Sequence, residues 1–313
     1  MNNMQRYFIA MDFDGTLAAT FDRSANGMDV KLAYELAIHE VFGQTGLEIY
    51  QKDGGLRNRE PGEVVKSILQ ALGSYSTNET KIATEEVVEK KLSHLNPEIS
   101  EQWPKLYPGV KGFFEQVASE KLPIDVGIVS SGHDDFIKRV FSVNGIRPPD
   151  ILVTSDILRS RNRSEIESCK PHTYQLAEAH RQWSKANINS QFSNNAESRN
   201  HGKPYMLYVG DDPIKDACLA ERARIPFLFV PFTHPYFDPD PEKGQLLLSD
   251  LSQLTDLFLE RNHELLEGKS FSSVLLSRED SELFPPRSPL ELSSPQTKTE
   301  SVSTFPLIRG KEF

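Results

Sequence analysis

The stretch that most constrains the fold is residues 7–17, in which an apolar run is followed by two aspartates and Gly-Thr. The apolar residues lack the 3.6-residue spacing of a helix, and such a run is typical of a short strand buried in a parallel sheet. Gly15 favours a tight exit from this strand, because glycine tolerates backbone angles that other residues avoid. Asp12 and Asp14 are therefore predicted at the carboxyl end of a strand, the edge at which open α/β sheets bind ligands.

Apolar strands alternate with helical segments along much of the remaining chain. Strands are predicted over 124–129, near 151–154, and over 205–209, 227–230 and 246–248. Apolar periodicity predicts helices over 110–120, 134–143, 171–185, 214–224 and 251–266. Alternating strands and helices predict an α/β fold with a Rossmann-like, doubly wound parallel sheet.

Three further helical segments, over 28–42, 63–72 and 80–95, separate the first strand from the next α/β unit. We therefore expect a core domain made of residues 5–17 and 106–267, with a helical insert over 18–105. Residues 268–313 are rich in serine, proline and charge, a composition that predicts a disordered tail.

Charge and composition exclude several classes of function. The net charge of −10 argues against nonspecific binding to nucleic acid or to anionic membranes. No apolar stretch approaches the roughly 20 residues that span a bilayer, and none has the pattern of a signal peptide. Two cysteines cannot form a disulfide framework, so a reduced, cytoplasmic protein is expected.

The residues that can carry chemistry follow the predicted strands. Asp12 and Asp14 follow the first strand, Ser130 ends the second, and Asp211 with Asp212 follows the fourth. Lys170 opens a helix after the third strand. All of them are expected at one edge of the sheet, and several carboxylates that close together repel one another unless they share a cation or a proton.

At this point the chain resembles the haloacid-dehalogenase-like (HAD) hydrolase superfamily, in its phosphatase branch. The resemblance rests on four motifs in order: Asp12-Phe13-Asp14-Gly15-Thr16, the strand that ends in Ser130, Lys170-Pro171, and Gly210-Asp211 with Asp216 downstream. The helical insert resembles the cap domain of the phosphoglycolate phosphatase and β-phosphoglucomutase subfamily. The likeness covers roughly residues 5–266.

The resemblance and the chemistry of the residues imply the same roles. Asp12 would attack phosphorus and form an aspartyl-phosphate, and Asp14 would serve as general acid and base. Ser130, with Ser131 and Gly132, would bind the phosphoryl oxygens at the start of the next helix, and Lys170 would neutralise charge. Oxygen ligands for Mg²⁺ would come from a set of acidic residues: Asp12, Asp14 through its backbone carbonyl, Asp211, and either Asp212 or Asp216.

Each role has a plainer structural alternative. Asp212 precedes Pro213 and is equally suited to cap a helix, and Asp216 could be an exposed helix residue. Ser130 could merely close a strand, and Lys170 could be a surface lysine. Arg57 and Arg59 in the insert could bind a substrate anion, although a solvated loop is the plainer interpretation.

The sequence thus predicts a Mg²⁺-dependent phosphatase that acts on a small phosphorylated metabolite. One alternative is a phosphomutase of the same fold, which returns the phosphoryl group to a sugar. The other is a noncatalytic binding protein that keeps the HAD fold. A dehalogenase is disfavoured, because the dehalogenases that the chain resembles lack the second aspartate, and Asp14 is present.

Overall fold

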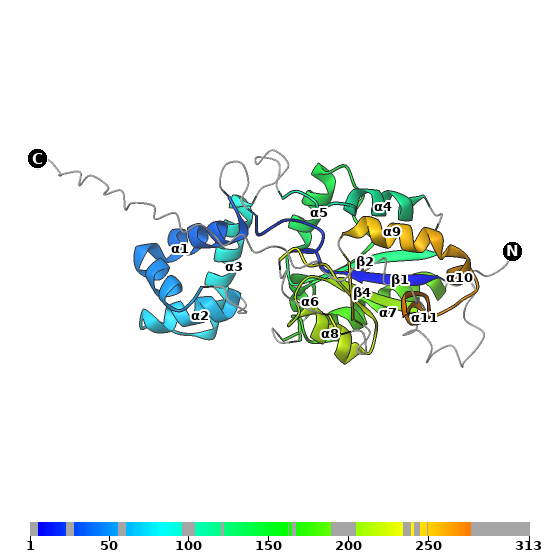
Figure 1. The fold of residues 1–313 in the computed structure, drawn as a ribbon. Coiled ribbons are helices and arrows are strands. Elements are labelled where there is room, and N and C mark those ends of the chain that lie inside the picture. The colour runs from blue at the N-terminus through cyan, green and yellow to red at the C-terminus, as the bar shows by residue number, and fades with distance from the viewer. Residues whose placement is uncertain are drawn as a thin grey trace, which may run out of the picture. The chain divides into compact units, whose positions relative to one another are not determined.

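A computed structural model describes residues 6–22, 28–55, 61–95, 104–119, 122–161, 163–164, 167–188, 205–233, 239–240, 245–248 and 250–276. The described residues form a six-stranded sheet of order β3-β2-β1-β4-β5-β6 (Figure 1), in which every pair of neighbours is parallel. The strands are β1 (Tyr7–Met11), β2 (Ile124–Ser130), β3 (Ile151–Thr154), β4 (Met206–Gly210), β5 (Phe227–Phe229) and β6 (Gln245–Leu247). The predicted Rossmann-like α/β fold is confirmed.

β1 lies in the middle of the sheet and is buried along its whole length. Ile9 pairs with Val126 of β2 on one side and with Leu207 of β4 on the other. A strand with neighbours on both edges and helices on both faces has no solvated side, which explains its uninterrupted apolar sequence. The carboxyl end of β1 therefore lies near the middle of the sheet edge at which the sequence predicts the candidate site residues.

Helices cover both faces of the sheet (Figure 1). One face carries α6 (Ser155–Ser160), α7 (Tyr174–Ile188) and α8 (Asp216–Ala223), and the other carries α4 (Val110–Ala118), α5 (Asp134–Val143) and α9 (Leu251–Glu260). On the first face Phe8 of β1 stacks on Trp183 of α7, with ring centroids 5.5 Å apart. On the second face Phe13 packs against Phe136 and Phe141 of α5.

The insert between β1 and α4 contains α1 (Val30–Lys52), α2 (Pro61–Ala71) and α3 (Thr77–His94). These helices enclose an apolar cluster of their own, to which Tyr34, Ile38, Val65, Ile68 and Val87 belong. The first helix was predicted to stop at residue 42, but it continues beyond a kink at Gly43, whose φ of 67° is left-handed. Glycine adopts this conformation without a steric penalty, so the helix resumes after a single non-helical residue.

The prediction of a disordered tail from residue 268 is wrong for its first part. Residues Phe271–Leu276 form α11, in which Phe271 and Val274 are fully buried. The Phe271 ring packs on Tyr7 of β1 and on Phe258 of α9. Burial of these apolar side chains outweighs the polar composition of the surrounding sequence. The rest of the predicted tail, from 277 onward, lies outside the described residues.

Smaller differences concern helix boundaries. The short helix α6 was not predicted, α7 begins at Tyr174 instead of at 171, and the expected helix over 251–266 is divided into α9 and α10 (Asn262–Leu266). None of the helices in the described ranges combines the length and the apolar character that a membrane crossing requires.

Candidate active site

The loop after β1 is held in a tight turn beside Asp211. The Asp12 N–H donates to Val209 O at 2.9 Å, and the Gly15 N–H donates to Ala18 O at 2.9 Å. Gly15 has a φ of 80°, and a Cβ at this position would lie 2.3 Å from Asp211 Oδ2. Glycine is therefore required here for two reasons, the left-handed backbone and the close approach of the carboxylate.

Lys170 lies between two buried carboxylates. Its Nζ is 2.7 Å from Asp12 Oδ1 and 2.7 Å from Asp216 Oδ1, and it donates to the Tyr208 hydroxyl at 3.4 Å. Burial alone would lower the pKa of Lys170, but Asp12 and Asp216 outweigh it and raise the pKa well above its usual value. Lys170 is thus a buried ammonium group with all three N–H donors used, and the surface-lysine alternative does not apply.

Asp216 is fully buried and has its acceptor positions filled. Its Oδ1 receives bonds from Lys170 and from the Tyr208 hydroxyl, at 2.7 and 3.0 Å. Its Oδ2 receives the N–H groups of Asp211 and Asp212, at 3.2 and 3.1 Å. Since an ionised carboxylate offers about four acceptor sites, Asp216 acts as a scaffold for Lys170 and for the loop after β4.

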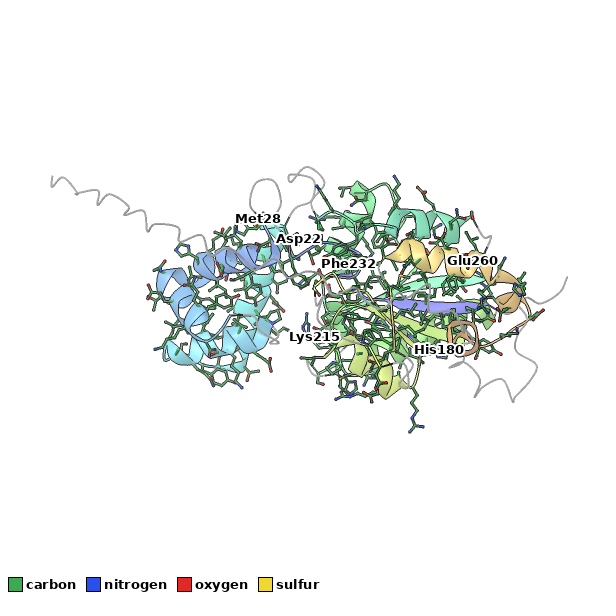
Figure 2. All side chains as sticks on the ribbon, in the orientation of Figure 1. Asp22, Met28, His180, Lys215, Phe232 and Glu260 are labelled. Carbon is green, nitrogen blue, oxygen red and sulfur yellow. The ribbon has the colours of Figure 1, made fainter. Side chains whose placement is uncertain are left out.

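Asp212 has the role of a helix cap. Its Oδ1 accepts the N–H groups of Ile214 and Lys215, at 2.8 and 2.9 Å, at the start of the turn that leads into α8. Lys215, labelled in Figure 2, is the residue before the first residue of this helix. Of the alternatives weighed for Asp212 and Asp216, the capping role fits Asp212, whereas Asp216 is not an exposed helix residue.

Asp211 is oriented by two hydroxyl groups. Thr16 donates to its Oδ1 at 2.9 Å, and Thr233 donates to its Oδ2. Burial, followed by the nearby Asp216 carboxylate, raises the pKa of Asp211 to about 7, although both threonines favour the ionised form. Asp211 belongs to the same cluster of buried carboxylates as Asp12.

Ser130 is fully buried at the end of β2. Its Oγ accepts the Gly132 N–H at 2.9 Å. A Cβ at Gly132 would lie 3.0 Å from Asp14 Oδ2 and 3.1 Å from Ser130 Oγ, so these two oxygens lie beside the same backbone segment. Asp14 and Ser131 are both half-buried.

The donor set fits a hard divalent cation. Carboxylate oxygens of Asp12, Asp211 and Asp216 lie within 4.8 Å of one another. Burial raises the pKa of Asp12 well above its usual value, and the Asp216, Asp211 and Asp14 carboxylates add to this effect against the opposing influence of Lys170. A cation would remove that repulsion, and Mg²⁺ accepts all-oxygen ligands. Among the described residues, Asp12, Asp211 and Asp216 therefore form a group of acidic side chains that could hold Mg²⁺, and Asp12 and Asp216 also pair with Lys170.

Two predicted substrate residues, Arg57 and Arg59, lie outside the described residues. Conversely, sequence reasoning missed Tyr208 and Thr233, which bond to Asp216 and Asp211. Tyr208 reads as one more apolar residue of a buried strand, and Thr233 lies in a loop with no motif. Only the site geometry could reveal either contact.

No protein-family model and no curated protein matches the chain. Many solved structures resemble it. A predicted phosphoglycolate phosphatase from Haemophilus somnus is 16% identical, with 82% of this chain and 99% of that chain covered and a TM-score of 0.49. A 2-haloacid dehalogenase from Pseudomonas syringae is 16% identical, with 82% and 99% covered and a TM-score of 0.46.

A Bacillus subtilis protein bound to magnesium and classed provisionally as a HAD-hydrolase is 14% identical, with 82% of this chain and 100% of that chain covered and a TM-score of 0.44. At such identities and TM-scores the likenesses carry no conclusion about activity, which depends on the residues of the site.

Proposed function

We propose that this protein is a HAD-like, Mg²⁺-dependent phosphatase that hydrolyses a small phosphomonoester through an aspartyl-phosphate on Asp12. The observation that supports this most is the buried triad of Asp12, Lys170 and Asp216, with both ion pairs at 2.7 Å. Lys170 binds Asp12 Oδ1, which fixes the carboxylate in one orientation and leaves Oδ2 as the oxygen that attacks. Three ionisable groups buried in contact with one another are costly to desolvate, and such clusters are enriched in sites that perform chemistry.

In the first step Asp12 Oδ2 attacks phosphorus, and the bond from phosphorus to the alcohol oxygen breaks. Asp14 gives its proton to the departing oxygen. In the second step Asp14 takes a proton from water, the water oxygen attacks phosphorus, and Asp12 is released with inorganic phosphate. Bound Mg²⁺ would supply positive charge that balances the carboxylates and the phosphoryl oxygens. Ser130 and the first turn of α5 would bind those oxygens.

Two features support phosphoryl transfer over a dehalogenase and over a noncatalytic binding protein. Asp14 lies beside the Gly132 backbone and Ser130 Oγ, where a proton donor is needed for an alcohol leaving group but not for a halide. A noncatalytic protein gains nothing from a fully satisfied ion-pair network at the cost of burying Lys170. A phosphomutase differs only in the acceptor of the second step, so it shares these residues.

The test is phosphate release from a broad panel of phosphomonoesters, measured with Mg²⁺ and with excess EDTA. We expect Mg²⁺-dependent release from at least one small substrate. Conversion of a sugar phosphate to its isomer without release would indicate the mutase, and chloride release from a 2-haloacid would indicate the dehalogenase. Full turnover in EDTA would contradict the metal requirement. We also propose a reducing, cytoplasmic location, supported by the presence of only two cysteines in the sequence.

A further inference from the structure

A buried amide at the start of α7 joins three separate loops of the sheet edge. Gln175 is fully buried. Its Nε2 donates to Ser168 O at 2.7 Å, to Ser130 O at 3.0 Å and to Ser155 Oγ at 3.1 Å. These acceptors belong to the segment before Lys170, to the end of β2 and to the start of α6.

The Ser155 hydroxyl completes the arrangement. It donates to Ser168 O at 2.8 Å while it accepts from Gln175, so the Ser168 carbonyl receives two hydrogen bonds. Ser155 and Ser168 are both fully buried. A single residue, Cys169, separates this doubly bonded carbonyl from Lys170, whose Nζ lies 2.7 Å from both Asp12 and Asp216.

The amide oxygen of Gln175 shows that this side chain is not present for stability alone. Gln175 Oε1 is buried, and the described part of the chain offers it no donor within hydrogen-bond distance. An unpaired buried oxygen is destabilising, so an amide is not the most stable side chain for this position. The three groups to which its Nε2 is bonded all act as acceptors toward it. The amide of Gln175 meets the need of this position for a neutral side chain with N–H donors.

We propose that Gln175 is a positioning residue, which fastens the segment before Lys170 to the end of β2 and thereby holds the Lys170 ammonium group against Asp12. The catalytic consequence rests on the proposed phosphatase function, but the placement of Lys170 does not. Loss of the amide donors would free the 168–170 backbone and let Nζ move relative to Asp12 Oδ1. A misplacement of about 1 Å in a catalytic constellation can lower the rate about 100-fold.

The test compares Gln175→Leu with Gln182→Leu in the full chain. Gln182 is on the same helix and donates its amide to Glu178 Oε1 at 3.0 Å, so its substitution removes a side-chain hydrogen bond away from the site. His180, labelled in Figure 2, marks the part of α7 between the two positions. Gln175→Leu should lower kcat by about 10- to 100-fold with KM changed less than threefold, and Gln182→Leu should leave both within twofold.

A second readout does not depend on activity. Lys170 is 7% exposed, so acetylation by an amine-reactive ester, followed by peptide mass spectrometry, should label it slowly in the unmodified protein. Gln175→Leu should speed the labelling of Lys170 at least fivefold, whereas Gln182→Leu should not. Should Gln175→Leu fail to fold, Ser155→Ala removes only the hydroxyl and should speed labelling in the same direction by a smaller factor.

Unchanged labelling of Lys170 in a folded Gln175→Leu protein would overturn the proposal, and so would equal kinetic losses in the two glutamine variants. If the unmodified protein released no phosphate from any substrate, the proposed function would fail while faster labelling of Lys170 would still support the positioning role. The two failures are therefore distinguishable.

Discussion

The sheet edge and the helical insert use burial in opposite ways. At the edge, charged and polar groups are buried and bonded to one another, as in the contacts of Lys170 with Asp12 and Asp216. In the described residues from 28 to 95, the only buried polar or charged residue is Asp29, whose side chain accepts the Leu32 N–H and caps α1. The edge is therefore held together by buried polar contacts, and the insert by apolar packing. Substitutions in the two regions should differ accordingly, in activity at the edge and in stability in the insert.

The largest expected effect is the loss of the nucleophile. Asp12→Asn replaces the carboxylate with an amide that cannot form an aspartyl-phosphate, so phosphatase activity should fall to background. Phosphate release in the presence of Mg²⁺ is the measurement. Asp150→Asn is the control, because Asp150 is exposed and its ion pair with the exposed Arg147 lies on the surface, so this variant should retain full activity. Measurable turnover by the Asp12→Asn protein would remove Asp12 from the mechanism.

Asp14→Asn should have the next largest effect, a loss of roughly 10²- to 10⁴-fold in kcat for alkyl phosphates. The phenolate of an aryl phosphate departs without much protonation, so the first step should be least affected for this substrate. Hydrolysis of the acyl phosphate still needs a base, and rapid-quench mixing should therefore show a burst of phenol followed by slow turnover. A linear time course with equal losses for aryl and alkyl substrates would indicate that Asp14 is only structural.

Removal of α11 tests whether the core extends beyond the predicted boundary. A chain that ends after Gly268 loses the buried Phe271, Val274 and Leu275, which should cost about 5 kcal/mol of unfolding free energy. A chain that ends after Leu276 keeps them and is the matched control. Thermal unfolding should show a Tm lower by many degrees for the shorter chain only. Equal Tm values would mean that α11 contributes nothing to stability.

In the insert, Ile68→Ala should lower the unfolding free energy by about 2–5 kcal/mol, because Ile68 is buried in the apolar cluster of α1–α3. Ile82→Ala is the control, since Ile82 is 55% exposed and its truncation should change stability by about 0.5 kcal/mol or less. Both variants should retain kcat on a small aryl phosphate within a few-fold below their unfolding temperature. If Ile68→Ala lost as much kcat as Asp14→Asn, the insert would affect activity directly, and the contrast between edge and insert would not hold.

The smallest expected effect is a loss of unfolding free energy at acidic pH, caused by His133 at the start of α5. Burial, followed by the charges of Lys91 and Arg159, lowers the pKa of His133 from 6.5 to about 2, against the Asp156 carboxylate 3.9 Å away. Below pH 6.5 the unfolded chain binds a proton that the folded protein does not. Stability should therefore be lost as the pH falls from 6.5 toward 2, by at most about 1.4 kcal/mol per pH unit from this group.

The measurement is the unfolding free energy at pH 7 and at pH 5, for the unmodified protein and for His133→Asn. The variant should lose less stability than the unmodified protein over this range, because asparagine does not titrate. Identical pH dependence in the two proteins would show that the folded protein accommodates the protonated imidazole. Either result also bears on substrate binding, since a neutral His133 would supply no positive charge to a phosphate.

The parallel sheet was predictable because its buried strands carry continuous apolar runs, and their polar ends mark one edge. The short helix α11 was not, because Phe271, Val274 and Leu275 stand in a serine- and charge-rich segment that resembles a tail. The distinction between Asp212 and Asp216 was also beyond the sequence. Both are acidic and near Gly210, and only the fold directs one of them to Lys170 and the other to the backbone of the next turn.

The central position of β1 has a consequence for synthesis on the ribosome. β1 is made first, but its neighbours are β2, which begins at Ile124, and β4, which begins at Met206. At about 5–20 residues per second, the strand must wait roughly ten seconds for its first partner, and longer for its second. The helices of the insert, whose contacts are local, can form during that interval. Newborn chains must therefore keep the apolar segment Tyr7–Met11 from pairing with other chains until most of the protein has been made.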